Sequence, residues 1–137
     1  MAVVGCLIPM IVCIRTVRIP PKDRERFLAW IDENRQLREE HGILFELVLE
    51  RSPRENPAKT LQRPEPEPLP EDEALVLTAW ASHEAFDAWI DTPDRDRLTD
   101  SDDHRAVQYQ PLTRYDLVGG YLNLVGLAAV AEQVEEE

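Results

Sequence analysis

The sequence predicts one α+β domain whose elements follow the order β-α-β-β-α-β, and three observations support this prediction. The chain has 137 residues, which is enough for one hydrophobic core. Its composition, with 43% hydrophobic and 31% charged residues, is that of a globular protein. Segments rich in β-branched residues alternate with segments of helical spacing, and proline or glycine separates them.

The first half of the chain predicts strand, helix and strand. Residues 10–19 are β-branched and apolar, and Pro20 and Pro21 end this buried strand. Residues 22–41 form the longer helix, which ends before Gly42. Its apolar stripe consists of Phe27, Trp30, Ile31 and Leu37. In the strand over residues 43–51, alternation places on one side Ile43, Phe45, Leu47 and Leu49, and on the other Glu46 and Glu50.

The second half begins with a proline-rich insertion over residues 52–70, which contains six of the eleven prolines. We expect it to be extended and unpaired, within the domain. Residues 73–81 form a strand, and Ser82 caps a short helix. The inward positions of this helix are Ala85, Phe86, Trp89 and Ile90. Residues 92–105 are at most partly helical, and residues 112–121 form the last strand.

This order is the ferredoxin-like split βαβ arrangement, an antiparallel four-stranded sheet with both helices on one face. The other apolar face needs a cover, so we expect a homodimer. The single domain then has a core over residues 10–121 and a C-terminal extension over residues 122–137. The extension carries a helical apolar stripe and is expected to dock on the partner or on its own sheet.

Charge and the chain's start limit the function classes. The net charge of −12 makes nucleic acid or an anionic membrane an unfavourable partner. The apolar residues 1–14 lack a basic region and a cleavage pattern, and are fewer than the roughly 18 residues of a spanning helix, so we expect a mature cytoplasmic protein. The two cysteines, Cys6 and Cys13, predict neither a disulfide nor a metal pair.

The segment from Val76 to Trp89, VLTAWASHEAFDAW, resembles the antibiotic biosynthesis monooxygenase family. It is also similar to the haem-degrading branch of that family, in which the last strand carries a Tyr-Asp pair like Tyr115-Asp116. The likeness covers roughly residues 10–121. It implies a dimeric α+β barrel in which each subunit holds an apolar pocket between its helices and its sheet.

The haem-degrading branch uses an Asn on the first strand, a Trp on the second helix and a His ten residues later. Trp89 matches the Trp, but no Asn precedes Asn34, and Thr99 stands at the His position. His104 would serve only if residues 94–103 carry an insertion. Without an axial His the iron lacks an evident ligand, so haem binding ranks third among our hypotheses and no cofactor is expected.

Several side chains are candidates for a binding site in the predicted pocket. Trp80 and Trp89, with Phe27 and Ile31, would form its walls, although a Trp at such a position is more often an ordinary core residue. Asn34 interrupts the apolar stripe of the first helix, so it either binds a substrate oxygen or is satisfied by a nearby backbone group.

Charged candidates complete this set. His104 lies among acidic residues and is the candidate proton acceptor. Asp102 and Asp103 beside it lack a further recognisable ligand, so no metal site is expected. Arg15 and Arg18 on the first strand and Arg114 on the last either hold an anionic substrate or form cross-strand ion pairs.

Our first hypothesis is a cofactor-independent monooxygenase that acts on a small aromatic or quinol-like substrate, with Asn34 and His104 as catalytic residues. Such chemistry requires the protein only to bind, deprotonate and exclude water. The alternative is a non-catalytic dimeric barrel that binds a small ligand or a protein partner, for which the proline-rich insertion and the acidic tail are suitable docking features.

Overall fold

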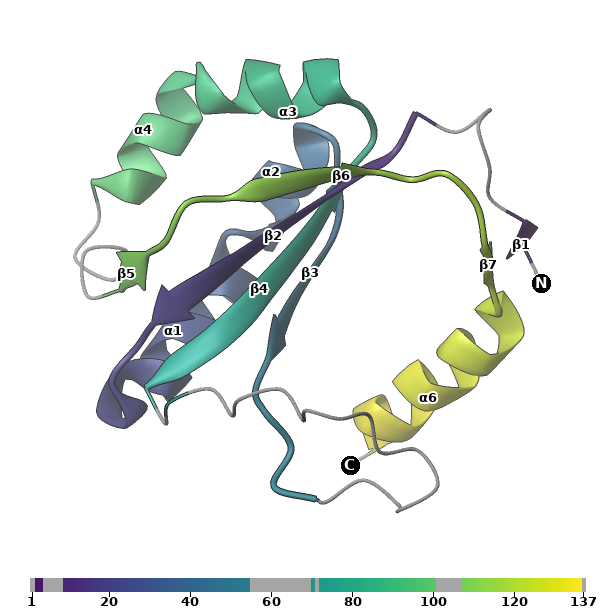
Figure 1. The fold of residues 1–137 in the computed structure, drawn as a ribbon, viewed down its shortest axis with the longest axis horizontal. Helices are drawn as coiled ribbons and strands as arrows, with labels where there is room; N and C mark the ends of the chain where they lie inside the picture. The colour runs from purple at the N-terminus through teal and green to yellow at the C-terminus, as the bar shows by residue number, and fades with distance from the viewer. Residues whose placement is uncertain (1, 4–8, 55–69, 71, 101–106, 137) are drawn as a thin grey trace, which may run out of the picture.

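The computed structural model describes residues 2–3, 9–54, 70, 72–100 and 107–136. The strands of its main sheet are β2 (Ile11–Arg18), β3 (Ile43–Leu49), β4 (Glu73–Trp80), β5 (Gln108–Tyr109) and β6 (Thr113–Asp116). β4 lies between β3 and β2, and both β5 and β6 pair with β2. All pairings are antiparallel (Figure 1). The predicted ferredoxin-like α+β fold is confirmed.

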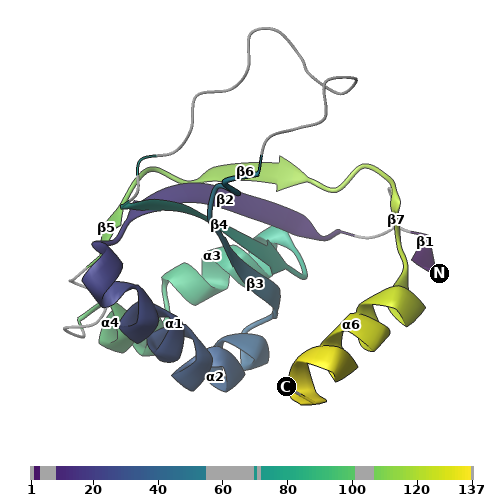
Figure 2. The ribbon, with the colours of Figure 1, turned by 90° about the horizontal axis from the view of Figure 1, so that it is seen from below.

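The helices of the body lie on one face of this sheet (Figure 2). They are a short 3-10 helix η1 (Pro21–Asp23), α1 (Arg24–Glu33), α2 (Arg35–Glu40), α3 (His83–Ile90) and α4 (Pro93–Thr99). The predicted first helix is thus divided, because Asn34 leaves helical geometry with a ψ of 8°. Gly42 follows α2 with a φ of 101°, a conformation that suits glycine at a helix end.

The last predicted strand is shorter than expected. β6 ends at Asp116, and β7 (Tyr121–Leu122) pairs instead with β1 (Ala2–Val3) in a separate two-stranded sheet. Pro111, between β5 and β6, cannot donate a ladder hydrogen bond. Gly120 has a φ of 115°, which breaks the extended path before β7.

Two buried clusters fill the space between helices and sheet. One includes Val17, Ile19, Phe27, Trp30 and Val76. The other includes Ile11, Cys13, Trp80, Phe86 and Trp89. Alternate residues of β2 and β4 supply both clusters, since Cys13 pairs with Thr78 and Val17 with Ala74.

A β-bulge corrects the facing that strict alternation predicts for β3. Ile43 pairs with Trp80 and Phe45 with Ala79, so Leu44 is the extra residue. Ile43 is therefore buried beneath the helices, on the side opposite to Phe45 rather than beside it. Glu46 pairs with Thr78 and consequently faces the helices.

The opposite face of the sheet is apolar and partly exposed. Leu47 pairs with Leu77 and is 48% exposed, and Leu49 pairs with Leu75. Tyr115 continues this surface on β6. The helices α1 to α4 all lie on the other side (Figure 2). We call this surface the outer face.

The tail forms the predicted helix, α6 (Leu124–Glu136). Asn123 precedes it and its Oδ1 accepts a hydrogen bond from the Gly126 amide at 3.0 Å. α6 stands apart from the layer of α1 to α4, and Val125 is 77% exposed (Figures 1 and 2). In the part of the chain that is described, the tail therefore does not cover its own sheet. No helix in that part is both long and apolar enough to cross a membrane.

Candidate functional site

A cavity of about 110 Å³ lies between the sheet and the helices. Strands β2, β3, β4 and β5 form its floor and helices α1 to α4 its roof. Its apolar lining includes Phe27, Trp30, Val76, Trp80, Phe86, Trp89, Ile90, Leu98 and Leu112. Its polar lining consists of Cys13, Arg15, Arg38, Glu46, Thr78, Arg95, Thr99 and Tyr109. The predicted pocket between helices and sheet is present, although its volume is below the roughly 300 Å³ typical of ligand sites.

The structure brings together three of the six predicted site residues. Phe27, Trp80 and Trp89 line the cavity. Ile31 instead lines a separate surface groove between α1 and β3.

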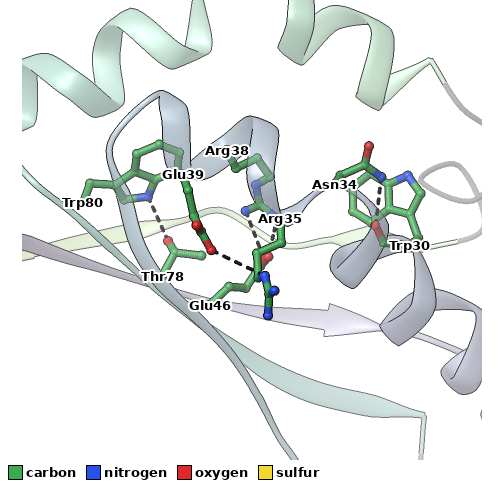
Figure 3. Close-up of polar contacts among 8 residues, drawn as sticks. All are labelled: Trp30, Asn34, Arg35, Arg38, Glu39, Glu46, Thr78 and Trp80. Atoms are coloured by element: carbon green, nitrogen blue, oxygen red, sulfur yellow. Dashed lines mark hydrogen bonds and ion pairs between the residues drawn. The ribbon is translucent and has the colours of Figure 1, made fainter.

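Asn34 lies at the junction of α1 and α2 and lines neither the cavity nor the groove. Its Nδ2 donates to the Trp30 carbonyl at 2.8 Å (Figure 3). Of the two alternatives for Asn34, this is the hydrogen bond to a nearby backbone group. The position therefore offers no contact with a ligand in the cavity. His104 lies outside the described residues.

The aromatic wall is held by ring contacts and one hydrogen bond. The Trp80 and Trp89 ring centroids are 6.1 Å apart with planes at 30°, and Phe86 meets Trp80 edge-on at 5.3 Å. Trp80 Nε1 donates to Thr78 Oγ1 at 3.1 Å (Figure 3). Behind Trp89 lies His41, whose ring centroid is 4.9 Å from that of the indole. These contacts fix the flat surfaces that face the cavity.

Arg38 and Glu46 form a two-pronged ion pair in the cavity wall. Arg38 reaches from α2 to the Glu46 carboxylate on β3, and its Nη2 lies 3.0 Å from Oε2 (Figure 3). The two side chains are 11% and 13% exposed. Glu46 is the one carboxylate that lines the cavity among the described residues. This pairing uses both of its oxygens.

Arg15 and Arg95 present cations to the same cavity without an acidic partner among the described residues. The Arg15 guanidinium lies over the Tyr109 ring, 5.4 Å from its centroid. Burial lowers the pKa of Arg15, and the charge of Arg95 lowers it further. The cavity is therefore positively charged in an acidic protein.

The two other predicted arginines do not share this site. Arg18 faces the opposite side of β2 and pairs with Glu73 at 3.1 Å. Arg114 is next to Cys13 in the ladder and binds Asp87 at 2.6 Å, with its guanidinium over the Phe86 ring. The cross-strand ion pair that we considered thus forms at Arg18 with Glu73, whereas Arg15 has none among the described residues.

Two weak acids in the lining are held in their neutral forms. Burial raises the pKa of Tyr109 to about 12, and the Glu46 carboxylate adds to this effect. Burial also raises the pKa of the Cys13 thiol, against the opposing effects of Thr78, Arg114 and Arg15. Neither group is therefore a ready base at neutral pH.

Sequence reasoning missed Arg38, Glu46, Arg95 and Tyr109. Arg38 lies four residues after Asn34 and eight after Trp30, so helical spacing indicated its inward direction. Glu46 faces inward only because of the bulge, which alternation does not reveal. Among the described residues no group of three His, Cys, Asp or Glu side chains could hold a metal ion.

Comparison with known proteins places these features in context. The family model described as antibiotic biosynthesis monooxygenase matches residues 10–107, which is more than half of the chain. No curated protein matches the chain.

Solved structures show similar folds at low sequence identity. SnoaB, a cofactor-independent oxygenase from Streptomyces nogalater, is 11% identical over 80% of this chain and 93% of its own, with a TM-score of 0.52. MhuD, a haem-degrader from Mycobacterium tuberculosis with two haems in its active site, is 18% identical over 79% of this chain and 95% of its own, with a TM-score of 0.54. A conserved protein of unknown function from Bacteroides thetaiotaomicron is 15% identical over 80% of this chain and 99% of its own, with a TM-score of 0.55. At these identities the likeness concerns the fold alone.

Proposed function

Because the chain belongs to the antibiotic biosynthesis monooxygenase family, we propose that it is a cofactor-independent monooxygenase that oxidises a small aromatic, quinol-like substrate in the cavity. The observation that carries the proposal is the combination of Trp80 and Trp89 in one cavity with Arg15, which has no acidic partner among the described residues. Flat apolar walls bind a ring, and the guanidinium stabilises the anion that must form before oxygen reacts.

For a hydroquinone the proposed overall reaction is quinol plus O₂ to hydroxyquinone plus water. The substrate loses a phenolic proton, and its carbanionic form passes one electron to O₂. The substrate radical and superoxide combine into a ring peroxide anion, which takes back the proton and becomes a hydroperoxide. The ring C–H proton then leaves while the O–O bond breaks, so that one oxygen atom stays as a carbonyl and the other departs as water.

We assign the steps to residues by their position in the cavity. Arg15 lowers the pKa of the bound phenol by stabilising its anion. Glu46 is the carboxylate of the described lining that would accept the proton, and Arg38 orients it. Trp80, Trp89 and Phe27 hold the ring and exclude water. His104 stays a candidate proton acceptor from the sequence.

Haem fits the described lining poorly. The lining contains no histidine in the described part, and its Tyr109 and Cys13 are held neutral by their raised pKa values. A tyrosinate or thiolate ligand would have to form against that tendency. We therefore route no step through haem.

A non-catalytic binding function is the second candidate. It is favoured by the Arg38–Glu46 pair, because both oxygens of this carboxylate already accept hydrogen bonds from the guanidinium. Under this alternative the same cavity would bind an aromatic ligand without turnover.

We propose in addition that two copies pair through the outer face, as the family resemblance implied. Phe45, Leu47 and Leu49 expose apolar surface there, and burial against a second copy would remove it from water.

Oxygen uptake with hydroquinones in air tests the enzymatic proposal. We expect turnover by the native protein, a loss of about 10- to 100-fold in kcat/KM for Arg15→Gln, and no change for Arg18→Gln, which alters the other face of the same strand. Binding of a hydroquinone without oxygen uptake would contradict catalysis and favour the binding function.

A further inference from the structure

The cavity carries more positive charge than the proposed reaction requires. Three arginines, Arg15, Arg38 and Arg95, line it against the single carboxylate of Glu46 among the described residues. Glu46 neutralises Arg38. Two cations are left, and the phenolate of the proposed reaction accounts for only one of them, at Arg15.

The second cation is Arg95 on α4. Of the two acidic residues that flank it on α4, Asp94 binds His41 and Arg97, and Asp96 is exposed. The Arg95 amide donates to Thr92 Oγ1 in the helix cap, which holds the first turn of α4 against the cavity. A half-buried guanidinium that has no carboxylate partner in the described part of the chain is a suitable site for an anionic ligand group.

The cavity volume limits the size of the ligand. Its 110 Å³ is smaller than the roughly 150 Å³ of an apolar cavity that binds benzene. A single ring is therefore the largest aromatic unit that suits this space, and fused polycyclic rings need side chains to move. The same walls carry the tryptophan rings on which a single ring stacks.

From this charge and this volume we infer that the ligand is a single-ring aromatic carboxylate, with its carboxylate on Arg95 and its phenolic oxygen toward Arg15. The inference rests on the proposed function, which it extends from an aromatic substrate to hydroxybenzoate-type acids. It requires no residue beyond those that line the cavity.

Titration calorimetry with benzoate and benzamide tests the carboxylate site, because the two probes share shape and differ in charge. We expect benzoate to bind at least tenfold more tightly. Arg95→Gln should weaken benzoate by about 10- to 100-fold and leave benzamide unchanged. Arg97→Gln, an exposed arginine on the same helix, is the matched control and should change neither affinity.

Three results would overturn the inference: equal binding of benzamide and benzoate, equal effects of the two arginine variants, or acetate binding as tightly as benzoate. Circular dichroism of each variant verifies that α4 remains folded. Oxygen uptake separates this inference from the proposed function. Oxidation of hydroquinone without benzoate binding would refute the carboxylate site alone, and Arg95-dependent benzoate binding without oxidation of 2,5-dihydroxybenzoate would refute catalysis alone.

Discussion

Arg38 and Glu46 place an ion pair where two apolar side chains would have filled the same space. Burying two charges costs solvation, which their attraction and two hydrogen bonds offset only in good geometry. The native pair has that geometry, with both carboxylate oxygens engaged. Replacing only one of the two residues leaves the other charge equally buried but without its partner.

We therefore expect Arg38→Met to lower the free energy of unfolding by about 3 kcal/mol. The double variant Arg38→Met with Glu46→Leu should recover most of this loss, because neither charge remains. Arg35→Gln on the same helix breaks only exposed pairs, with Glu39 and Asp32, and should cost less than about 0.5 kcal/mol. Urea unfolding measures all three, and a double variant as unstable as the single one would contradict the explanation.

The raised pKa of the Tyr109 phenol should make the free energy of unfolding decrease at alkaline pH. Its pKa in the folded protein is about 12, above the value of about 10 of an unfolded chain, so the folded state retains the proton over this interval. Stability should be intact below pH 10 and decrease by on the order of 2 kcal/mol as the pH rises from 10 to 12.

Unfolding curves across this pH range, with the ultraviolet absorbance of the phenolate as a second signal, measure the effect of Tyr109. Tyr109→Phe should flatten the decrease. Tyr115→Phe removes an exposed tyrosine on β6 and should leave the decrease in place. An equal decrease in native protein and Tyr109→Phe would show that another group is responsible.

At this scale the sequence predicted apolar walls better than polar partners. Trp80 and Trp89 have the helix and strand positions expected of inward residues, and both line the cavity. The polar site depends on tertiary pairing: Glu46 turns inward at a bulge, and Asn34 bonds to its own helix instead of a ligand. Local periodicity carries no information on either event.

Among the elements, α3 has the clearest start signal. Ser82 Oγ accepts a hydrogen bond from the Ala85 amide at 3.0 Å, as its position before the helix predicts. Ser82→Ala should lower the free energy of unfolding by about 1 kcal/mol. Ser82→Asp should keep most of the native stability, because aspartate also caps helices. Ser52→Ala, in an exposed loop, is the control and should have little effect. Thermal unfolding measures the three, and equal stability of Ser82→Ala and native protein would contradict the cap.

The strands with continuous apolar or alternating patterns were predicted within about two residues, as for β2 and β4. The last strand, over residues 112–121, was predicted as longer than it is. Its composition favours one strand, but Pro111 and Gly120 interrupt the pairing before β6 and after it. The first helix was predicted as one element because its hydrophobic spacing continues through Asn34. Because the break between α1 and α2 keeps the helical spacing of apolar residues, periodicity alone does not reveal it.

At the scale of the whole molecule, the outer face determines whether two copies associate. Leu47 lies on this face at 48% exposure. Leu47→Lys would place a charge in the proposed interface, so we expect it to shift the protein from dimer to monomer in analytical ultracentrifugation. Leu28→Lys on α1, an exposed leucine away from that face, is the matched control and should leave the dimer intact. A native protein that sediments as a monomer would refute the pairing itself.

The extra residue in β3 has a consequence for how this strand can change in length. Ile43 faces inward and Phe45 outward, as neighbours do in an uninterrupted ladder, so excising Leu44 would join them without reversing any later side chain. Excising a residue farther along β3 would reverse the facing of every later side chain, so that a leucine of the outer face would point into the cavity. Leu44, which is 54% exposed, is therefore the point in β3 at which a one-residue deletion is best accommodated, and a suitable place to attach a spectroscopic label.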